Sequence, residues 1–228
     1  MSYIECENLA LGYEGKAVVS GLNFKVNKGD YLCVLGENGA GKSTLIKTLL
    51  NLIDKVSGRI EYGDGLKDYE IGYLPQQTVV QKDFPATVWE VVLSGTLAGS
   101  GFKPFYGKKE KSLAIEKMRE LDITDLKKKC YRNLSGGQQQ RAAIARALIK
   151  NPKILLCDEL TGALDSKSSR SVLKFIEKIN EQFKTTIIII THNEAIADMA
   201  DSVIRIKDGR IADYTENSHK LSAEELAL

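Results

Sequence analysis

The chain has few residues of the kinds that build disulfide frameworks and zinc sites. Its 228 residues include only four cysteines and two histidines. The cysteines, at positions 6, 33, 130 and 157, are widely scattered, which fits neither a disulfide framework nor the ligand spacing of a zinc centre. We therefore expect them to pack as small hydrophobic residues in the interior.

Long apolar runs and an excess of charge of one sign are also lacking. No stretch approaches the roughly 20 apolar residues of a membrane-spanning helix, and the polar start of the chain is unlike a signal peptide. The 32 basic and 30 acidic residues leave a net charge of only +2, so no broad positive field is available to hold nucleic acid. The composition therefore predicts a cytoplasmic chain with a sizeable core and no nucleic-acid partner.

What the sequence does contain is a glycine-rich loop of the phosphate-binding type. Residues 31–44 read YLCVLGENGAGKST, an apolar strand that runs into the loop and then into a helix beginning at Lys42. Gly36, Gly41, Lys42 and Ser43 fit the spacing G-x-x-x-x-G-K-[ST]. In that pattern backbone N–H groups surround phosphate, the lysine reaches the β- and γ-phosphates, and the hydroxyl ligates Mg²⁺. The helix also directs its positive N-terminal end at the same anion.

Short strands and a helical region surround this loop. Residues 3–9 and 22–27 are expected to pair as half-buried antiparallel strands, and residues 58–62 and 70–74 as further strands. Gln76 lies just beyond the last of these. Residues 78–133 have a different, helical pattern, with helices expected over 87–97 and 109–121, where Ala114, Met118 and Leu121 share a face. We interpret this region, up to about residue 145, as an inserted helical lobe. Its loop at 99–111 fits either a solvated surface or a partner contact.

The C-terminal half contains two apolar runs, residues 154–157 and 185–190, that predict parallel strands covered on both faces. An amphipathic crossover helix around 172–179 joins them into a right-handed βαβ unit. A final hairpin is expected over 202–213, followed by a polar tail from about 214 to 228 to which the sequence assigns no chemistry.

In such sheets ligands lie beyond the carboxyl ends of the strands, and five polar features are predicted to meet there: Gly36, Gln76, Asp158, Glu159 and His192. Asp158 ends a buried strand and is the candidate Mg²⁺ ligand. Glu159 follows it and is the candidate general base for a water that attacks the γ-phosphate, although a solvent-exposed acid is the alternative. His192 is placed to sense the γ-phosphate, with an ordinary structural histidine as the alternative.

Three motifs in this order carry a family resemblance: GENGAGKS at 36–43, LSGGQ at 134–138 and ILLCDE at 154–159. Over essentially its whole length the chain resembles the nucleotide-binding subunit of an ABC transporter. The resemblance implies one ATP-binding domain over residues 1–228, of α/β class. This is a P-loop NTPase core with a mostly parallel sheet, an N-terminal antiparallel β subdomain and an inserted helical subdomain.

The resemblance also implies roles for individual residues. Tyr13 would stack on adenine, Gln76 would lie near Mg²⁺ and the attacking water, Asp165 would end the loop after the acidic motif, and His192 would be the switch histidine. One departure is Leu160, where the family commonly has proline. The nucleotide site would be Gly36, Glu37, Asn38, Gly39, Ala40, Gly41, Lys42, Ser43 and Thr44, with Mg²⁺ held by Ser43, Gln76 and Asp158.

The partners of the chain follow from the same resemblance. Two copies would close head to tail, so that Ser135, Gly136, Gly137 and Gln138 of one chain meet the γ-phosphate held by Lys42 of the other. A separate integral membrane permease would dock on the helical lobe near Gln76. The chain would then be a peripheral protein at the cytoplasmic face of the membrane, and an extracellular solute-binding protein would be an indirect partner.

Within the family, residues 87–95 and 103–111 are similar to ATP-binding subunits of zinc and manganese importers. The hypothesis is an ATPase that energises metal-ion import. Three alternatives stay open: an ABC ATPase that transports another solute in either direction, a non-transport ABC ATPase, and a module that holds ATP without hydrolysing it. The chain has neither the tandem domains nor the long coiled-coil insertion of many non-transport members, and its intact Glu159 and His192 favour hydrolysis.

Overall fold

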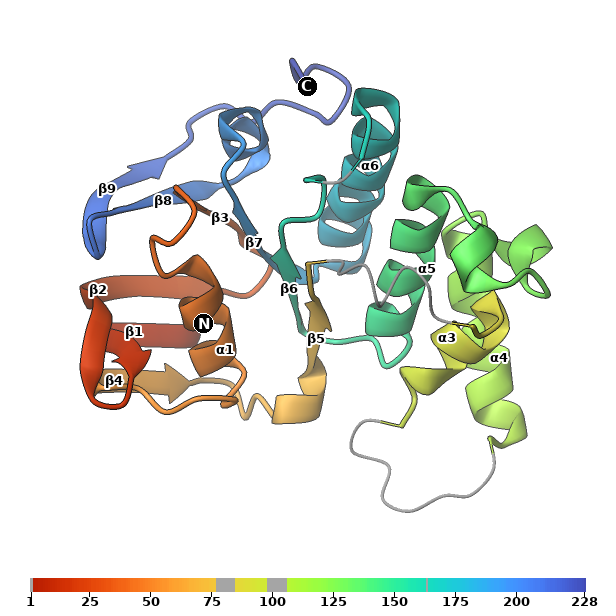
Figure 1. Ribbon diagram of the computed structural model, residues 1–228, viewed down its shortest axis with the longest axis horizontal. Helices are drawn as coiled ribbons and strands as arrows, with labels where there is room; N and C mark the ends of the chain where they lie inside the picture. Colours follow the sequence, from red (N-terminus) through yellow and green to blue (C-terminus); the bar gives the residue numbers. More distant parts are fainter. Residues whose placement is uncertain (1, 77–84, 98–105, 163) are drawn as a thin grey trace.

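The computed structural model describes residues 2–76, 85–97, 106–162 and 164–228. Its centre is a six-stranded sheet with the order β5-β6-β7-β3-β8-β9 (Figure 1). All neighbouring strands in it are parallel except β8 and β9, which form the expected hairpin. The strands are β3 (Tyr31–Gly36), β5 (Ile71–Leu74), β6 (Ile154–Asp158), β7 (Thr186–Thr191), β8 (Ser202–Lys207) and β9 (Arg210–Glu216).

A second, antiparallel sheet has the order β2-β1-β4, with β1 at Ser2–Tyr13, β2 at Lys16–Asn27 and β4 at Ser57–Tyr62. The first two strands are much longer than the sequence predicted. The register of β1 against β2 shifts at several points between Cys6 and Gly12, and such bulges interrupt the alternation of apolar and polar residues by which a strand is recognised. The predicted antiparallel pairing itself is confirmed.

The helix after the glycine-rich loop, α1 (Lys42–Leu49), begins where it was predicted but is shorter than expected. The apolar spacing continues to Ile53, but the chain turns at Asn51, which has a left-handed φ of 54°. The N–H groups of Asn51 and Leu52 donate back to the carbonyl oxygens of Thr48 and Lys47, which is how a left-handed residue closes the end of a helix. Leu50 and Ile53, which continue the apolar spacing of Leu45, Ile46 and Leu49, therefore lie beyond the end of the helix.

The helical lobe consists of α3 (Val88–Ser94), α4 (Lys108–Glu120) and α5 (Gly136–Leu148), and α6 (Ser166–Phe183) covers the sheet beside it (Figure 1). Short 3₁₀ turns connect the elements: η1 (Asp68–Glu70), η2 (Thr124–Leu126), η3 (Tyr131–Asn133) and η4 (Glu194–Met199). The predicted helix over 87–97 ends early, at Ser94. Most of the loop at 99–111 lies outside the described residues.

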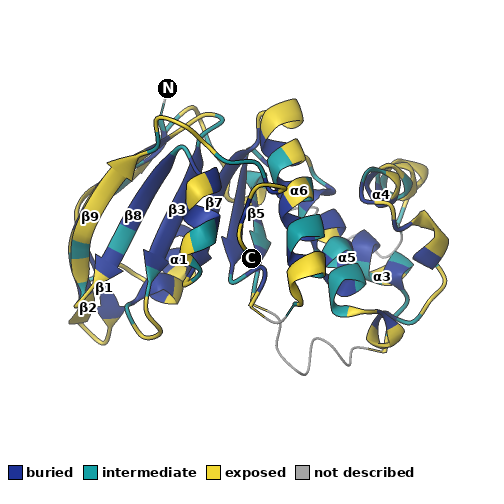
Figure 2. Cartoon of the chain, turned by 90° about the horizontal axis from the view of Figure 1, so that it is seen from above, coloured by how far each residue is buried: buried dark blue, intermediate teal, exposed yellow. Residues whose placement is uncertain are grey.

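Two hydrophobic clusters cover the two faces of the central sheet. Along β3, Tyr31, Cys33 and Leu35 belong to the cluster beneath the helical lobe and α6. Leu32 and Val34 belong to the cluster shared with α1 and the antiparallel sheet. Figure 2 shows β3, β7 and β8 largely buried, with the exposed edge strand β9 on one side and more exposed helices such as α6 and α4 on the other. The strands read as continuous apolar runs because both faces are covered. The predicted α/β class is confirmed.

The cysteines match the expectation at three positions. Cys6, Cys33 and Cys157 are free and buried, whereas Cys130 is free but only partly buried. Cys130 lies at the edge of the lobe, where its backbone forms an isolated bridge with Thr87. Among the described residues, no helix is both long and apolar enough to cross a membrane.

The close packing of Gly95 at the end of α3 yields a stability prediction. A Cβ atom at Gly95 would lie 2.1 Å from the carbonyl oxygen of Arg146, whereas one at Gly107 would meet only the flexible end of Glu110. Both glycines have negative φ, −62° and −77°, so alanine causes no backbone strain at either. Gly95→Ala should lower the free energy of unfolding by about 1 to 3 kcal/mol, and Gly107→Ala by less than about 0.5 kcal/mol. Denaturant unfolding measures both, and equal effects would refute the packing.

Candidate functional site

The carboxyl ends of the parallel strands open onto a cavity of about 310 Å³. The glycine-rich loop after β3 forms one wall, Gln76 after β5 forms another, and the end of β6 supplies two carboxylates. This is the edge of the sheet at which the sequence predicted a ligand site. The residues that line the cavity are Tyr13, Val18, Asn38, Gly39, Gly41, Lys42, Ser43, Thr44, Gln76, Asp158 and Glu159.

The glycine-rich loop has a conformation that depends on its glycines. Gly41 has a φ of 93°, and a Cβ atom there would lie 2.1 Å from Cγ2 of Val19. Lys42, whose exposed fraction is 6%, donates from Nζ to the carbonyl oxygens of Gly36 at 2.8 Å and Glu37 at 2.9 Å. The loop therefore curls around the lysine ammonium group. The backbone amides of such a loop, together with the ammonium group, suit the binding of a phosphate group.

Asp158 is the buried carboxylate of this cavity. Its exposed fraction is 6%, and its side chain shares hydrogen bonds with Ser43 and Tyr73. Burial, followed by the nearby charge of Glu159, raises the pKa of Asp158, while Lys42 and Ser43 act in the opposite direction. Burial also raises the pKa of Tyr73 to about 12. A carboxylate and a hydroxyl held side by side, with the Gln76 amide on the same cavity, are hard oxygen donors of the type that suits Mg²⁺.

Glu159 follows in a strained conformation, with a left-handed φ of 49°. Its backbone N–H donates to the carbonyl oxygen of Ile190 at 2.9 Å. Oε1 lies 4.0 Å from Lys42 Nζ and 2.9 Å from His192 Nδ1. Non-glycine residues hold positive φ at a cost that surrounding contacts must offset, and such strain clusters at functional sites. Here the strained backbone conformation of Glu159 places its nearly buried carboxylate between Lys42 and His192.

His192 lies outside the main cavity and reaches the site through Glu159. Its side chain has an exposed fraction of 55%. It lines a neighbouring cavity of about 140 Å³ that also contains Glu159, Leu164 and Ser166. Beyond it, Asn193 Oδ1 accepts from the N–H of Ala195 and caps η4. His192 therefore lies between the end of β7 and the start of the 3₁₀ turn η4.

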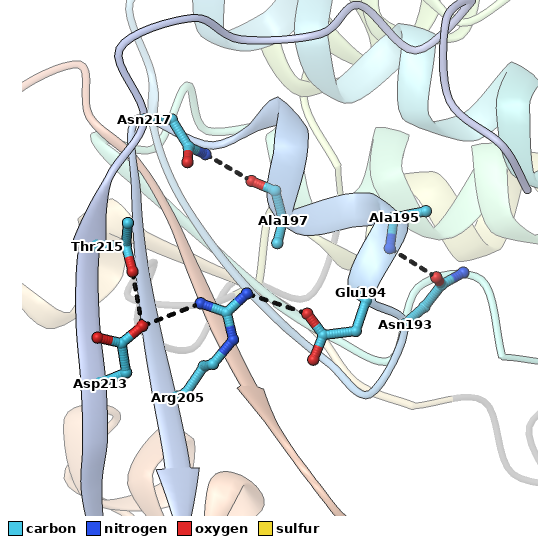
Figure 3. A network of polar contacts seen from close by, with 8 residues as sticks. All are labelled: Asn193, Glu194, Ala195, Ala197, Arg205, Asp213, Thr215 and Asn217. Carbon is cyan, nitrogen blue, oxygen red and sulfur yellow. Dashed lines mark hydrogen bonds and ion pairs between the residues drawn. The ribbon is translucent and has the colours of Figure 1, made fainter.

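A polar network fixes the turn that follows His192. Figure 3 shows the guanidinium of Arg205, on β8, between two carboxylates. Its Nη2 lies 3.1 Å from Glu194 Oε2 and its Nη1 lies 3.3 Å from Asp213 Oδ2. Arg205 thus joins the edge hairpin to the first residue of η4.

Tyr13 stands at the mouth of the main cavity with an exposed fraction of 47%. A hydrogen bond to the side chain of Thr44 is the main cause that lowers the pKa of its hydroxyl. The ring is therefore tied to α1 while its face remains open. Such a ring can stack on a planar base. Gln76 is also exposed and lines the same cavity.

The residues of the LSGGQ motif are not brought to this cavity. Among the described residues that line either cavity, none belongs to 135–138. Ser135 instead caps α5 by accepting from the N–H of Gln138. Asp165 caps the adjacent helix α6 through the N–H and hydroxyl of Ser168. A Cβ atom at Gly137 would lie 3.2 Å from Ser168, so the two helix starts are in close contact.

Sequence reasoning missed Tyr73, which hydrogen-bonds Asp158. It also missed Val18 and Leu228, which line the two cavities. Tyr73 lies on β5, whose register places Leu74 opposite Cys157 and so brings Tyr73 near Asp158. That register cannot be read from the sequence of either strand. Val18 and Leu228 come from segments far away in the chain, and an apolar residue in such a segment gives no signal of its own.

Comparison with known proteins gives a consistent result. The family model described as ABC transporter matches residues 19–162. The manganese transport system ATP-binding protein MntB of Bacillus subtilis is 34% identical over 212 residues, which cover 92% of this chain and 85% of that protein. The zinc uptake system ATP-binding protein ZurA of Listeria monocytogenes is 32% identical over 234 residues, which cover 99% and 91%.

A solved structure also matches. The ATP-binding cassette MJ0796, described as a dimer in a post-hydrolysis state bound to ADP and phosphate, superposes with a TM-score of 0.76. It is 27% identical in sequence, and the match covers 93% of this chain and 98% of that one.

The electrostatics of Asp158 predict a stability effect that depends on pH. A raised pKa means that the folded chain binds this proton more readily than the unfolded chain, so the ionised carboxylate destabilises the fold above that pKa. Asp158→Asn should therefore increase the free energy of unfolding at neutral pH. The gain should vanish as pH falls through the raised pKa toward the usual value of 3.8.

Denaturant unfolding across pH, without nucleotide or Mg²⁺, measures this effect. Asp165→Asn is the control, because hydrogen bonds from Ser168 lower the pKa of Asp165 and its ionised form is thus favoured in the folded chain. It should bring no gain at neutral pH. A loss of stability for Asp158→Asn at neutral pH would contradict the account.

Proposed function

We propose that this chain, which belongs to the ABC transporter family and is the ATP-hydrolysing subunit of such a transporter, energises the import of manganese or zinc. The metal would pass through a separate membrane permease. The observation that supports the enzymatic part is the cavity in which Lys42, Asp158 and Glu159 converge. The support for the cargo comes from the two relatives, which are named as subunits of a manganese transport system and a zinc uptake system.

The nucleotide is held by the glycine-rich loop in this proposal. Residues 36–44 supply backbone amides, and Lys42 exchanges its two carbonyl partners for phosphate oxygens. Tyr13 offers its ring face to the adenine base. Ser43, Asp158 and Gln76 supply the oxygen ligands for Mg²⁺. When bound, the ion neutralises charge on the β- and γ-phosphates.

Glu159 is the general base. Its carboxylate, with a side-chain exposed fraction of 9%, is protected from bulk water yet lies at the phosphate end of the cavity, where it can take a proton from an attacking water. The 2.9 Å contact with His192 Nδ1 fixes one carboxylate oxygen. That leaves the other oxygen to accept the proton. His192 thus orients the base from the neighbouring cavity, and in this proposal it senses the γ-phosphate through that contact.

The signature residues Ser135, Gly136, Gly137 and Gln138 complete the site of a second copy. They lie away from the chain's own cavity but form the start of α5, where Ser135 is exposed and the next three residues are partly exposed. A helix start of this kind stabilises phosphate. The similar cassette is described as a dimer, which supports pairing of two copies; the head-to-tail arrangement of the pair is part of this proposal. Assembly of the charged site only on closure would couple hydrolysis to movement.

The permease would receive that movement at the cytoplasmic face of the membrane. In this proposal it contacts the helical lobe near Gln76, which leaves the main sheet at the point where the lobe begins. An extracellular solute-binding protein would deliver the metal from the other side. The second candidate is transport of a different solute, which the family match alone supports equally well.

Glu159→Gln tests the chemistry. The variant should reduce ATP turnover about 10²- to 10⁴-fold, equivalent to roughly 3 to 5 kcal/mol of barrier, because the amide cannot accept the proton. ATP binding should be retained. Glu61→Gln is the control, since Glu61 pairs with Arg59 on the antiparallel sheet and lines neither cavity. A Glu159→Gln chain with unchanged turnover would assign the base elsewhere.

The cargo is tested in cells. Loss of the gene should lower cellular manganese or zinc and slow growth under chelation, and added metal should restore growth. A strain carrying Glu159→Gln should behave like the deletion, because the permease lacks its energy source. Elemental analysis would contradict the metal assignment if both metals stayed at parental levels while uptake of another solute was lost.

A further inference from the structure

The segment at residues 217–228, here called the strap, is attached to the fold at defined points, although the sequence predicted a polar tail without chemistry. It follows β9 and runs beside α6, where the chain ends in Figure 1. Ala223 and Leu226 have exposed fractions of 0% and 2% and belong to the cluster beneath the helical lobe and α6. Burial of two apolar residues fixes the strap in place.

One end of the strap is anchored to η4. Asn217 Nδ2 donates to the carbonyl oxygens of Ala197 and Ala200, both at 2.9 Å, and Figure 3 shows the first of these bonds. The N–H of Leu221 donates to the carbonyl oxygen of Asp198 at 2.9 Å. The carbonyl oxygen of Ala197 also accepts from the N–H of Ala200, so the strap adds a second donor there. It also supplies donors to the carbonyl oxygens of Asp198 and Ala200 at the end of the turn.

The other end is anchored to α6. Arg170 Nη2 donates to the carbonyl oxygen of Leu226 at 2.9 Å, and the N–H of Ala223 donates to Glu177 Oε2 at 3.4 Å. Lys174 and Glu224 form an ion pair. The strap therefore connects α6 with η4, which precede and follow β7 in the chain.

Both anchored elements begin at the site. η4 starts two residues after His192, and α6 starts directly after Asp165. The cavity of about 140 Å³ between these starts contains His192 and Glu159 and is also lined by Leu228 of the strap. The strap thus reaches this cavity through Leu228, while Asn217 holds the end of η4.

We propose that the strap is a positioning segment for His192 and that Asn217 is its principal contact with η4. His192 is more than half exposed, so few side-chain contacts hold it and its position depends on the backbone of η4. That element is a 3₁₀ turn with weak internal hydrogen bonds. Arg205 holds its first residue and Asn217 holds its end (Figure 3). The inference rests on the proposed function of His192.

Asn217→Asp is the test, with Asn23→Asp as its matched control. The change keeps the size of the side chain but removes both donors to η4. Asn23 also donates from Nδ2 to two oxygens, those of Gly21 and Asn8, but lies on the antiparallel sheet. Asn217→Asp should reduce kcat about 10-fold, since a displacement on the order of 1 Å is costly at a reacting centre. KM for ATP and the kcat of the control should stay at parental values.

A spectroscopic measurement separates positioning from general stability. The chain has two histidines, so in a His219→Gln background the only imidazole NMR signals come from His192. Asn217→Asp, and Arg170→Met at the opposite anchor, should each shift these signals, and Asn23→Asp should not. Either variant that folds is sufficient for the test.

A lower melting temperature with unchanged His192 signals and unchanged kcat would overturn the proposal, because the strap would then only stabilise the fold. The signals are read without turnover. A wrong assignment of Glu159 as base would therefore appear in the Glu159→Gln assay and leave this measurement intact.

Discussion

The site depends on one constraint: the buried ammonium group of Lys42 must be held beside the buried carboxylate of Asp158 and the nearly buried one of Glu159 without pairing directly with either. Lys42 is held by two backbone carbonyls of its own loop, and the closest carboxylate oxygen of Glu159 stays 4.0 Å away. Direct pairing would satisfy the charges but would leave no place for an anion. The two carbonyl oxygens satisfy the hydrogen-bonding needs of the buried ammonium group in the absence of a ligand. Phosphate oxygens can then replace these carbonyl oxygens as partners of Lys42.

The surrounding architecture keeps these charges apart. β3 and β6 are separated by β7 in the sheet, so the loop with Lys42 and the strand end with Asp158 and Glu159 approach from different directions. Both strands are buried on two faces, which makes the strand ends rigid. The left-handed conformation of Glu159 then turns its side chain toward His192. In this way strain in one residue is maintained by a well-packed sheet.

Much of the fold could be predicted because its signals are local. The phosphate loop has a fixed spacing, and β6 and β7 are continuous apolar runs, so the positions of these elements followed from the sequence. The family match confirms the resemblance that was drawn from the three motifs. The lengths of β1 and β2 and the end of α3 were missed because bulges and the packing of Gly95 depend on distant segments. Tyr73 and the strap were missed for the same reason: their partners are set by strand register and tertiary packing.

The central claim is that one chain holds half of each hydrolytic site, and mixing two inactive variants tests it most directly. Ser135→Arg places bulk where the γ-phosphate of a partner copy approaches, and Lys42→Ala removes the lysine of the chain's own loop. A heterodimer of the two has one site with both defects and one site with neither. The account predicts that the mixture hydrolyses ATP faster than either variant alone. A mixture that forms heterodimers yet gains no activity would contradict it.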